Sequence, residues 1–334
     1  MDRVSATLGL QYLGGEEFES YCRAHKGHLL GAIAFGARCE HEAPDCPYAH
    51  VELRTLEQAS AFEIWTSGQP VVRDDQFGIA TARNDELLFG CLQVSADAHL
   101  NQAVYGAYCR IFDVAERLGY YHLLRVWHYL PRINGDADGL ERYRWFNVGR
   151  HEAFRSHGRV IEECAPAACA LGTGGGPLTI YFLAARKPGQ PVSNPRQWAP
   201  YRYPPSYGPR GPAFSRGMRA TVGGVPVLFI SGTASIVGHE TMHAGDAVAQ
   251  AHETAENLRA VLEQVRAESM DYTGPSARKF FRVYLRNPGN LRAVRDRLAQ
   301  SLAPRSTVIY LQADICRSDL LLEVEGAWVA GAGA

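Results

Sequence analysis

The chain has 334 residues, of which 46% are hydrophobic and 21% are charged, and its formal net charge is -1 at pH 7. This balance is typical of a soluble globular protein and excludes an overall field that would attract nucleic acid or a membrane surface. The length predicts two domains, each large enough for its own hydrophobic core.

The N-terminal and cysteine patterns predict a cytoplasmic protein. The first residues carry acidic side chains and lack the apolar core of a signal peptide, and no run of about eighteen apolar residues occurs in the sequence. The chain holds 8 cysteines at irregular spacing, which indicates reduced thiols when no signal is present. We therefore expect no membrane segment and a cytoplasmic location.

The pattern of the first half becomes regular after residue 83. Residues 1–75 look irregular, with a strand expected at residues 29–35 and a helix near residues 56–65. The stretch RNDELLFGCLQVSAD then predicts a hairpin strand, and the residues that follow it carry apolar side chains at helical spacing.

The second half repeats the order of elements in the first half. An apolar strand at residues 225–230 leads through a corner at Gly232 toward a helix that we expect to begin at Asp246, a suitable N-cap. The paired segments are residues 83–97 with 222–237, 100–119 with 247–265, 123–130 with 280–288, 138–158 with 289–303, and 176–185 with 304–313. Five elements in the same order indicate an internal duplication. The expected fold class is α/β (α+β), with two duplicated units that each form a mixed β-sheet with helices packed on one face.

A segment rich in proline, tyrosine and arginine joins the two halves. The glycine and proline content of residues 187–217 is that of a flexible linker. The segment also contains the aromatic and arginine residues Trp198, Tyr201, Tyr203, Tyr207, Phe214, Arg196, Arg202, Arg210 and Arg216. Because aromatic side chains favour burial, we expect an ordered loop that lies over a pocket. The domains on either side would be residues 1–186, which include the irregular N-terminal extension, and residues 218–334.

Two motifs offer ligands for a metal ion, and neither fits a zinc site well. The first interleaves its ligand types instead of pairing them as C-x2–4-C and H-x3–5-H, and comprises Cys39, His41, Cys46 and His50. The second runs from His239 to His243 and satisfies H-E-x-x-H, but the glycines around it favour a turn-rich loop over a helix. We therefore expect no metal, and a zinc protease is the alternative from another class of chemistry.

The glycine run at residues 172–176 predicts a turn. It lacks the pattern of a P-loop and leads into a strand instead of a helix. The sequence contains no G-x-S-x-G elbow, so it gives little support for a Ser–His–Asp hydrolase.

Arginines recur where strands end or helices begin. Each alone is more often a surface charge or a member of an ion pair. Together they suit a small dianion, because guanidinium groups match carboxylates bidentately. The arginines in such places are Arg132, Arg150, Arg210, Arg286 and Arg305.

The C-terminal stretch LLLEVEGAW carries two glutamates in apolar surroundings. Strand alternation places Glu323 and Glu325 on one face and Leu322 and Val324 on the other. Either both carboxylates are solvated, or one lies in a low-dielectric site with a raised pKa. The second condition is that of a general acid at neutral pH.

Three stretches resemble the chorismatase family, namely FISGTASIVGH, YPPSYGPRGPAFSR and ICRSDLLLEVE. The resemblance extends over almost the whole chain. It is strongest to the branch that forms hydroxybenzoates from chorismate, in particular the bifunctional 3- and 4-hydroxybenzoate-forming type of xanthomonadin pigment and ubiquinone biosynthesis. It implies domains similar to the RidA/YjgF group, in agreement with the duplication, and an active site between the two halves.

The resemblance also implies roles for individual residues. Glu323 falls at the position of the family's general acid and would protonate the methylene of the enol ether, after which the ether breaks and pyruvate leaves. The candidates to hold the two carboxylates of chorismate are Arg132, Arg150, Tyr203, Arg210 and Arg286. The resemblance implies that no metal, flavin or nicotinamide cofactor is required.

Two positions steer the product in this family. Gly232 stands where the dienediol-forming branch is expected to carry alanine, and Cys316 stands where that branch lacks a thiol. The pair resembles the 3-hydroxybenzoate-forming type, in which loss of water and aromatisation are favoured. The alternative interpretation of Cys316 is a buried, inert thiol.

The expected activity is cleavage of chorismate to pyruvate and 3-hydroxybenzoate, with 4-hydroxybenzoate as a second product. Two alternatives stay open. One is a chorismate hydrolase that gives 3,4-dihydroxycyclohexa-1,5-diene carboxylate, and the other is a RidA-like small-molecule binder without catalysis. We expect no nucleic-acid or membrane partner, and the sequence leaves the oligomeric state open.

Overall fold

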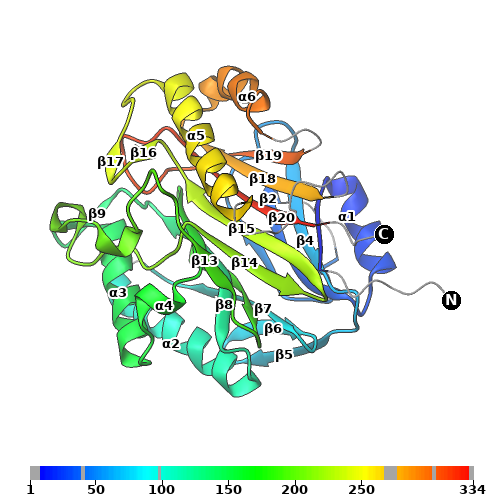
Figure 1. Ribbon diagram of the computed structural model, residues 1–334. Coiled ribbons are helices and arrows are strands. Elements are labelled where there is room, and N and C mark those ends of the chain that lie inside the picture. The colour runs from blue at the N-terminus through cyan, green and yellow to red at the C-terminus, as the bar shows by residue number, and fades with distance from the viewer. Residues whose placement is uncertain (1–7, 39–41, 97–98, 267–276, 303–305, 331–334) are drawn as a thin grey trace.

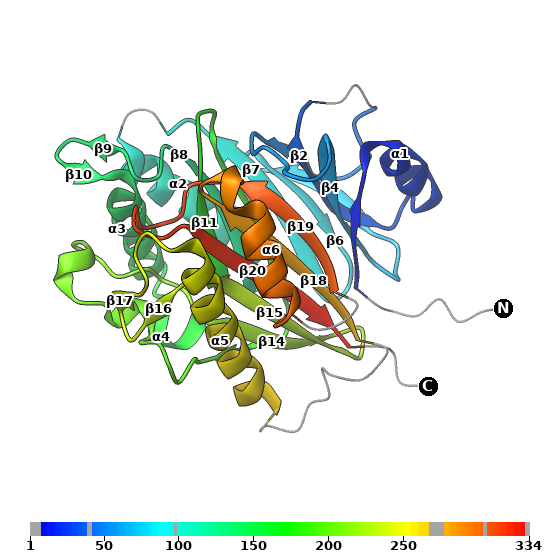
Figure 2. The ribbon, with the colours of Figure 1, turned by 90° about the horizontal axis from the view of Figure 1, so that it is seen from above.

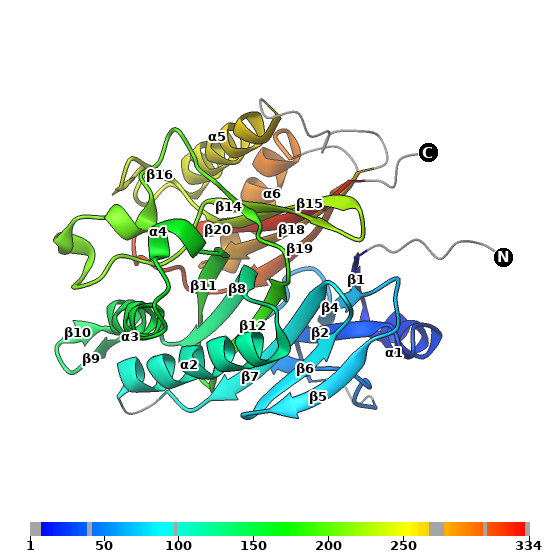
Figure 3. The ribbon, with the colours of Figure 1, turned by 60° about the horizontal axis from the view of Figure 1, so that its bottom comes forward.

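The computed structural model describes residues 8–38, 42–96, 99–266, 277–302 and 306–330. These residues form three main β-sheets whose inner faces meet at a shared core. The helices lie on the outside, with α5 and α6 above the sheets, α2 and α3 at the lower left, and α1 at the right (Figure 1, Figure 3). No helix in the described part of the chain is long and apolar enough to cross a membrane.

The first six-stranded sheet belongs to the N-terminal half. Its order is β11-β8-β12-β7-β6-β5. The strands are β5 (Val72–Gln76), β6 (Ile79–Arg83), β7 (Leu87–Val94), β8 (His122–Pro131), β11 (Ala167–Thr173) and β12 (Leu178–Ala185). Its outer face is covered by α2 (Leu100–Leu118) and α3 (Arg142–Ser156), which enclose a hydrophobic cluster of their own, and the short α4 (Ile161–Cys164) follows.

The second six-stranded sheet belongs to the C-terminal half. Its order is β13-β14-β15-β20-β18-β19. The strands are β13 (Gln190–Val192), β14 (Gly217–Val222), β15 (Val225–Thr233), β18 (Arg278–Leu285), β19 (Ser306–Gln312) and β20 (Leu322–Val329). The helices α5 (Ala247–Arg266) and α6 (Leu291–Ala299) lie across its outer face (Figure 2).

The two sheets share one topology, which confirms the predicted duplication of mixed sheets. In both, a central strand pairs antiparallel with two neighbours, and the last pair is parallel, β8 with β11 in the first sheet and β18 with β19 in the second. The central strand is β12 in one half and β20 in the other. The predicted match of residues 176–185 with 304–313 is therefore wrong, because β12 corresponds to β20 and β11 to β19. Short apolar strands resemble one another in sequence, and only their hydrogen-bonded partners tell them apart.

The third sheet comes from the N-terminal extension, and its order is β1-β4-β2-β3. Its elements are β1 (Gly9–Leu13), the helix α1 (Gly15–Ala24), β2 (Leu29–Gly36), β3 (Tyr48–Val51) and β4 (Ser60–Thr66). The predicted strand at residues 29–35 is confirmed, but the predicted helix near residues 56–65 is wrong. Every residue of β4 is buried, so packing on both faces selects an extended strand of aromatic and β-branched residues.

The long helices start and stop where local signals place them. The Asp246 carboxylate accepts hydrogen bonds from the backbone N–H groups of Val248 and Ala249 at 3.0 and 2.9 Å, which confirms the predicted N-cap of α5. Gly119 ends α2 with a φ of 80°, a left-handed conformation that glycine adopts without strain. α3 begins only at Arg142, although the repeated segment starts at residue 138, because β9 (Asp136–Ala137) and β10 (Leu140–Glu141) form a small hairpin before it.

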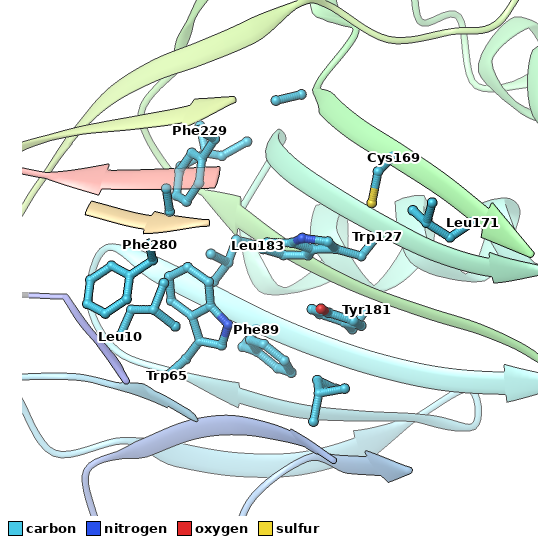
Figure 4. Packing of buried hydrophobic residues seen from close by; sticks show 14 of the residues in the cluster. Leu10, Trp65, Phe89, Trp127, Cys169, Leu171, Tyr181, Leu183, Phe229 and Phe280 are labelled. Atoms are coloured by element: carbon cyan, nitrogen blue, oxygen red, sulfur yellow. The ribbon is translucent and has the colours of Figure 1, made fainter. Parts of the chain in front are cut away.

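The shared core joins all three sheets through large aromatic side chains. Trp65 of β4, Trp127 of β8 and Phe229 of β15 belong to one buried cluster, in which the ring of Trp127 stacks on Tyr181 at 4.5 Å between centroids (Figure 4). Aromatic contacts of this kind add to the free energy of burial. The core therefore fixes the two halves relative to each other and holds the strands that carry the candidate site.

Candidate active site

A cavity of about 270 Å³ lies where the two halves meet the connecting segment 187–217. The first half contributes residues of β10, α3 and β11, and the second half contributes residues of β15, β20 and the loop that precedes β20. The lining residues are Glu141, Tyr143, Arg144, Arg150, Ala168, Cys169, Ala170, Tyr203, Tyr207, Pro212, Phe214, Arg216, Gly232, Ala234, Ile236, Cys316, Arg317, Ser318, Asp319 and Glu323. Five of the eight residues predicted for the site are among them.

Glu323 presents its carboxyl group to this cavity from β20. Glu323 and Glu325 lie on the inner face of the strand, while Leu322 and Val324 pack under the helices, as the alternation predicts. Glu323 is only 4% exposed, and its Oε1 has no hydrogen-bond partner among the described residues. Burial raises the pKa of Glu323 to about 8, although the charges of Arg125 and Arg216 act to lower it. The carboxyl group is therefore protonated at neutral pH.

Gly232 creates the space that this carboxyl group occupies. A Cβ atom at residue 232 would lie 2.6 Å from Cδ of Glu323 and 3.2 Å from Cβ of Cys169. A contact of that length would force the Glu323 side chain to move. The absence of a side chain at Gly232 thus sets the position of the acid.

The thiol of Cys316 also faces the cavity, from the loop before β20. Burial, together with the negative charge of Glu323, raises the pKa of Cys316 to about 12. A second thiol lines the cavity at Cys169, whose pKa burial raises to about 11. Both thiols are therefore uncharged at neutral pH, so neither is a ready thiolate nucleophile.

Arg150 brings a buried positive charge to the cavity from α3. It is 2% exposed, and its Nε and Nη2 atoms have no hydrogen-bond partner among the described residues. The guanidinium lies over the rings of Tyr108 and Phe146, at 5.3 and 6.0 Å from their centroids. A buried guanidinium with free donors is suited to bind an anion, because desolvation otherwise disfavours its charge.

Arg216 and Arg317 complete a basic wall that the sequence analysis did not assign to the site. Arg216 donates from Nη2 to the carbonyl of Trp198 at 2.8 Å and to the hydroxyl of Tyr203 at 2.7 Å. Arg317 stacks on the ring of Tyr207 at 4.0 Å. Within the described residues, Nε of Arg216 and Nη2 of Arg317 have no hydrogen-bond partner. Both arginines lie inside the stretches quoted for the family resemblance, and that position was the signal that could have found them.

Tyr203 lines the cavity, whereas three of the predicted arginines do not. Arg210 borders a separate surface hollow together with Arg155 and Arg159. Arg132 lies at the end of β8 in a left-handed conformation with a φ of 52°. A role for either in binding substrate carboxylates stays a prediction.

Arg286 holds the loop before β20 instead of facing the cavity. Its Nε donates to the carbonyl of Leu320 at 2.9 Å, its Nη1 pairs with Asp314 at 2.5 Å, and its Nη2 donates to the carbonyl of Arg317 at 3.0 Å. Its guanidinium is therefore occupied by the protein. Arg305 lies outside the described residues.

The predicted metal motifs do not form clusters of ligands. The H-E-x-x-H stretch at residues 239–243 contains β17 (Glu240–Thr241), which pairs with β16 (Ile236–Val237) in a hairpin. Because the stretch is not a helix, its two histidines do not share a helical face. Cys39 and His41 lie outside the described residues. Where the chain is described, no group of three or more His, Cys, Asp or Glu side chains has the arrangement of a metal site.

Named proteins are similar in sequence to almost the whole of this chain. The family described as "Chorismatase FkbO/Hyg5-like, N-terminal" matches residues 63–184. A protein named chorismatase from Streptomyces rapamycinicus is 38% identical over 333 residues, which cover 96% of this chain and 95% of that protein. A protein named 3-hydroxybenzoate synthase from Streptomyces hygroscopicus is 35% identical over 310 residues, which cover 90% of this chain and 91% of that protein.

The chain belongs to the chorismatase family. A crystal structure of a chorismatase superposes on it with a TM-score of 0.85 at 32% identity, and covers 96% of this chain and 98% of that one. The sequence-based assignment to the family is thereby confirmed.

The cavity combines three kinds of chemical group. A protonated carboxyl group can donate a proton, the arginines can hold carboxylates, and aromatic side chains of the connecting segment form part of the wall. A small dianion with an acid-labile bond could use these groups, since the arginines would bind its negative charges and the carboxyl group would protonate the bond.

Proposed function

We propose that this chain cleaves chorismate to pyruvate and 3-hydroxybenzoate, with Glu323 as the general acid. The observation that supports this most strongly is the carboxyl group of Glu323, which is buried, protonated at neutral pH, and faces a cavity lined by Arg150, Arg216 and Arg317. The names of the relatives, chorismatase and 3-hydroxybenzoate synthase, support the substrate and the product.

The proposed reaction begins with a proton transfer from Glu323 to the methylene carbon of the enolpyruvyl ether. The π electrons of that methylene form the new C–H bond, and the adjacent carbon becomes an oxocarbenium ion. Water adds to this carbon and returns a proton to the Glu323 carboxylate, and the resulting hemiketal collapses to pyruvate and a ring alcohol. The ring then loses water and becomes aromatic, so the overall reaction consumes no water.

The proposed binding mode assigns the carboxylates of chorismate to the basic wall. Arg150 has the donors to hold one carboxylate, and Arg216 and Arg317 have donors for the other. Tyr203 lies beside Arg216 and helps to fix its guanidinium. In this binding mode, the guanidinium groups compensate the two negative charges of the substrate.

We also propose that Gly232 and Cys316 direct the reaction to the aromatic product. Gly232 lets the Glu323 carboxyl group lie where a larger residue would displace it, and Cys316 offers an uncharged thiol near the ring. A second product, 4-hydroxybenzoate, and a place in pigment and ubiquinone biosynthesis are proposed from the sequence resemblance alone. A cytoplasmic location is proposed because the seven cysteines that the structure describes are all free thiols.

The test is an incubation of the metal-free protein with chorismate, in which products are separated by chromatography and identified by mass. We expect pyruvate and 3-hydroxybenzoate, and any 4-hydroxybenzoate is resolved in the same run. The variant Glu323→Gln should lose at least about 100-fold in kcat while it still binds chorismate. The matched control is Glu256→Gln on the outer face of α5, which should keep full activity.

Other outcomes separate the alternatives. Pyruvate with a non-aromatic diene would assign the chain to the dienediol-forming branch. Binding of chorismate without any pyruvate would favour a non-catalytic binder. A Glu323→Gln protein with unchanged kcat would refute the role of Glu323.

A further inference from the structure

Behind Glu323 lies a buried set of charged residues that the proposed proton transfer does not itself use. Glu325 is two residues further along β20 on the same inner face. Its Oε2 forms an ion pair with Nη2 of Arg125, and its Oε1 lies 2.9 Å from Nε of Arg282. All three residues are at most 2% exposed, and burial of this kind is costly unless it serves packing or function.

This ion pair engages only part of the guanidinium group of Arg125. It extends from β8, where it lies opposite Ala167 of β11, and its guanidinium lies over the ring of Trp127 at 4.9 Å. Its Nε and Nη1 atoms are buried and have no hydrogen-bond partner among the described residues. Glu325 thus pairs with only part of the guanidinium, and two of its donors stay without a partner among the described residues.

Glu323 lies close to this ion pair, because it is two residues from Glu325 on the same face of β20 and lies beside Cys169, which is two residues along β11 from the strand partner of Arg125. Arg125 is fully buried and is not among the residues that line the cavity, so it acts on Glu323 from the core. In agreement with this placement, its charge acts to lower the pKa of Glu323 and of Cys169.

We propose that Arg125, held by Glu325, is a positioning residue that stabilises the carboxylate which Glu323 becomes when it gives up its proton. This inference rests on the proposed function, because it assumes that Glu323 is the proton donor. When the O–H bond of Glu323 breaks, its electron pair stays on the carboxylate, and the fixed positive charge of Arg125 offsets that new negative charge. The charge is in place before the reaction, so no solvent has to reorganise.

The ion pair with Glu325 sets how strongly Arg125 acts. If Arg125 carried no counter-charge, it would lower the pKa of Glu323 further and leave less of the protonated acid at neutral pH. If Arg125 were absent, Glu323 would be too weak an acid to donate its proton readily. When Arg125 is paired with Glu325, only part of its positive charge acts on Glu323. This partial charge is compatible with a Glu323 that is protonated before the reaction and can ionise during it.

Other groups also face Glu323 and must be held constant in any test. They are Cys169 from β11, Tyr143 from α3, Arg216 from the segment before β14, and Cys316 from the loop before β20. Cys169, Cys316 and Tyr143 are uncharged near neutral pH, because burial raises the pKa of each. Arg125 and Arg216 are the permanent charges among the groups that act on Glu323, and of the two only Arg125 is tied to Glu325.

The experiment measures the pH dependence of kcat/KM with chorismate from pH 6 to 10 at constant ionic strength. The wild-type kcat/KM should fall as the pH rises past about 8, where Glu323 of the free enzyme loses its proton. We call the midpoint of this fall the alkaline limb. Glu325→Gln keeps the shape of the side chain but frees the charge of Arg125, so the limb should move about one pH unit lower. Arg125→Met removes the charge, so the limb should move about one pH unit higher, and kcat should fall about 10-fold or more.

Two further variants distinguish the proposal from loss of structure. In the double variant Arg125→Met/Glu325→Gln both charges are gone, and the limb should return to within about half a pH unit of the wild type. In Glu63→Gln, which alters the far end of the same buried network at Arg282, the limb should stay in place. A merely structural role would lower activity in each variant without shifts of opposite sign.

The outcomes are separable from those of the proposed function. If Glu323→Gln is inactive and the limb does not move in Glu325→Gln, the role of Arg125 is refuted while Glu323 stands. If Arg125→Met fails to fold, Glu325→Gln and the double variant still decide the question. If Glu323→Gln keeps full kcat, the proposed function itself fails.

Discussion

Glu323 lowers the stability of the fold at the pH at which it is proposed to work. Its carboxyl group ionises with a pKa of about 8 in the native state, whereas the ordinary value for a glutamate is 4.5. Below pH 4.5 the group is protonated in both the folded and the unfolded chain and has no effect. As the pH rises from 4.5 to 8, the unfolded chain releases the proton while the native state retains it, so the free energy of unfolding falls.

The variant Glu323→Gln should therefore be more stable than the wild type at alkaline pH. The gain in the free energy of unfolding should be close to zero near pH 4 and grow to an upper limit on the order of 3–5 kcal/mol above pH 8. Urea unfolding of both proteins at several pH values measures this difference. Glu256→Gln serves as the surface control, and a gain for Glu323→Gln that did not depend on pH would contradict the raised pKa.

At the scale of elements, the loop between β19 and β20 delivers four lining residues to the cavity, Cys316, Arg317, Ser318 and Asp319. The loop is anchored to the first half by backbone hydrogen bonds between Asp314 and Gly172 of 2.7 and 3.2 Å. Arg286 closes the loop by donating to three of its carbonyl groups, those of Ile315, Arg317 and Leu320. The site thus depends on a side chain that does not face it.

The variant Arg286→Met should loosen this loop without unfolding the chain. Three carbonyl groups would lose their donor, so we expect a loss of about 2–4 kcal/mol of local stability and a fall in kcat/KM of about 10-fold or more. Hydrogen exchange of residues 313–321 should accelerate, and the exposed Arg292→Met should leave it unchanged. A fall in activity with unaltered exchange would instead favour the direct substrate contact that the sequence resemblance implies for Arg286.

At the scale of the whole molecule, one buried network joins the three sheets. Arg282 of β18 forms an ion pair with Glu63 of β4, and Tyr129 of β8 shares a hydrogen bond of 2.9 Å with Tyr284 of β18. Trp65 donates to Glu63 at 2.6 Å. These contacts join β4 of the N-terminal extension to strands of both duplicated units. The N-terminal extension is therefore part of the same core as the two units.

Because the core is shared, the variant Glu63→Leu should destabilise the entire chain. It leaves Arg282 without one of its two counter-charges, which should lower the free energy of unfolding by about 3–5 kcal/mol in a single cooperative transition. The double variant Glu63→Leu/Arg282→Leu tests whether the remaining charge causes the loss. An early, separate transition of the N-terminal extension, seen by denaturant titration with two spectroscopic probes, would contradict the shared core.

The sequence alone determined the features that depend on local periodicity and on residues close together along the chain. Alternation in β20 placed Glu323 and Glu325 on one face, the N-cap at Asp246 marked the start of α5, and the repeated order of elements revealed the duplication. The family resemblance then pointed to Glu323 as the proposed general acid and to four other residues that line the cavity. The predicted helix near residues 56–65 failed because burial on both faces of β4 overrides local preference.

Only the tertiary structure decided which charges meet. Glu323 and Glu325 have the same strand environment in sequence, yet one is an uncharged acid at the cavity and the other is an ion-paired carboxylate, because desolvation and Coulomb attraction depend on distances in space. In the sequence, Arg150 and Arg286 were equivalent candidates to hold a substrate carboxylate. Among the described residues, the fold leaves two buried donors of Arg150, which lines the cavity, without a partner, and it occupies the guanidinium of Arg286 with backbone carbonyls and Asp314.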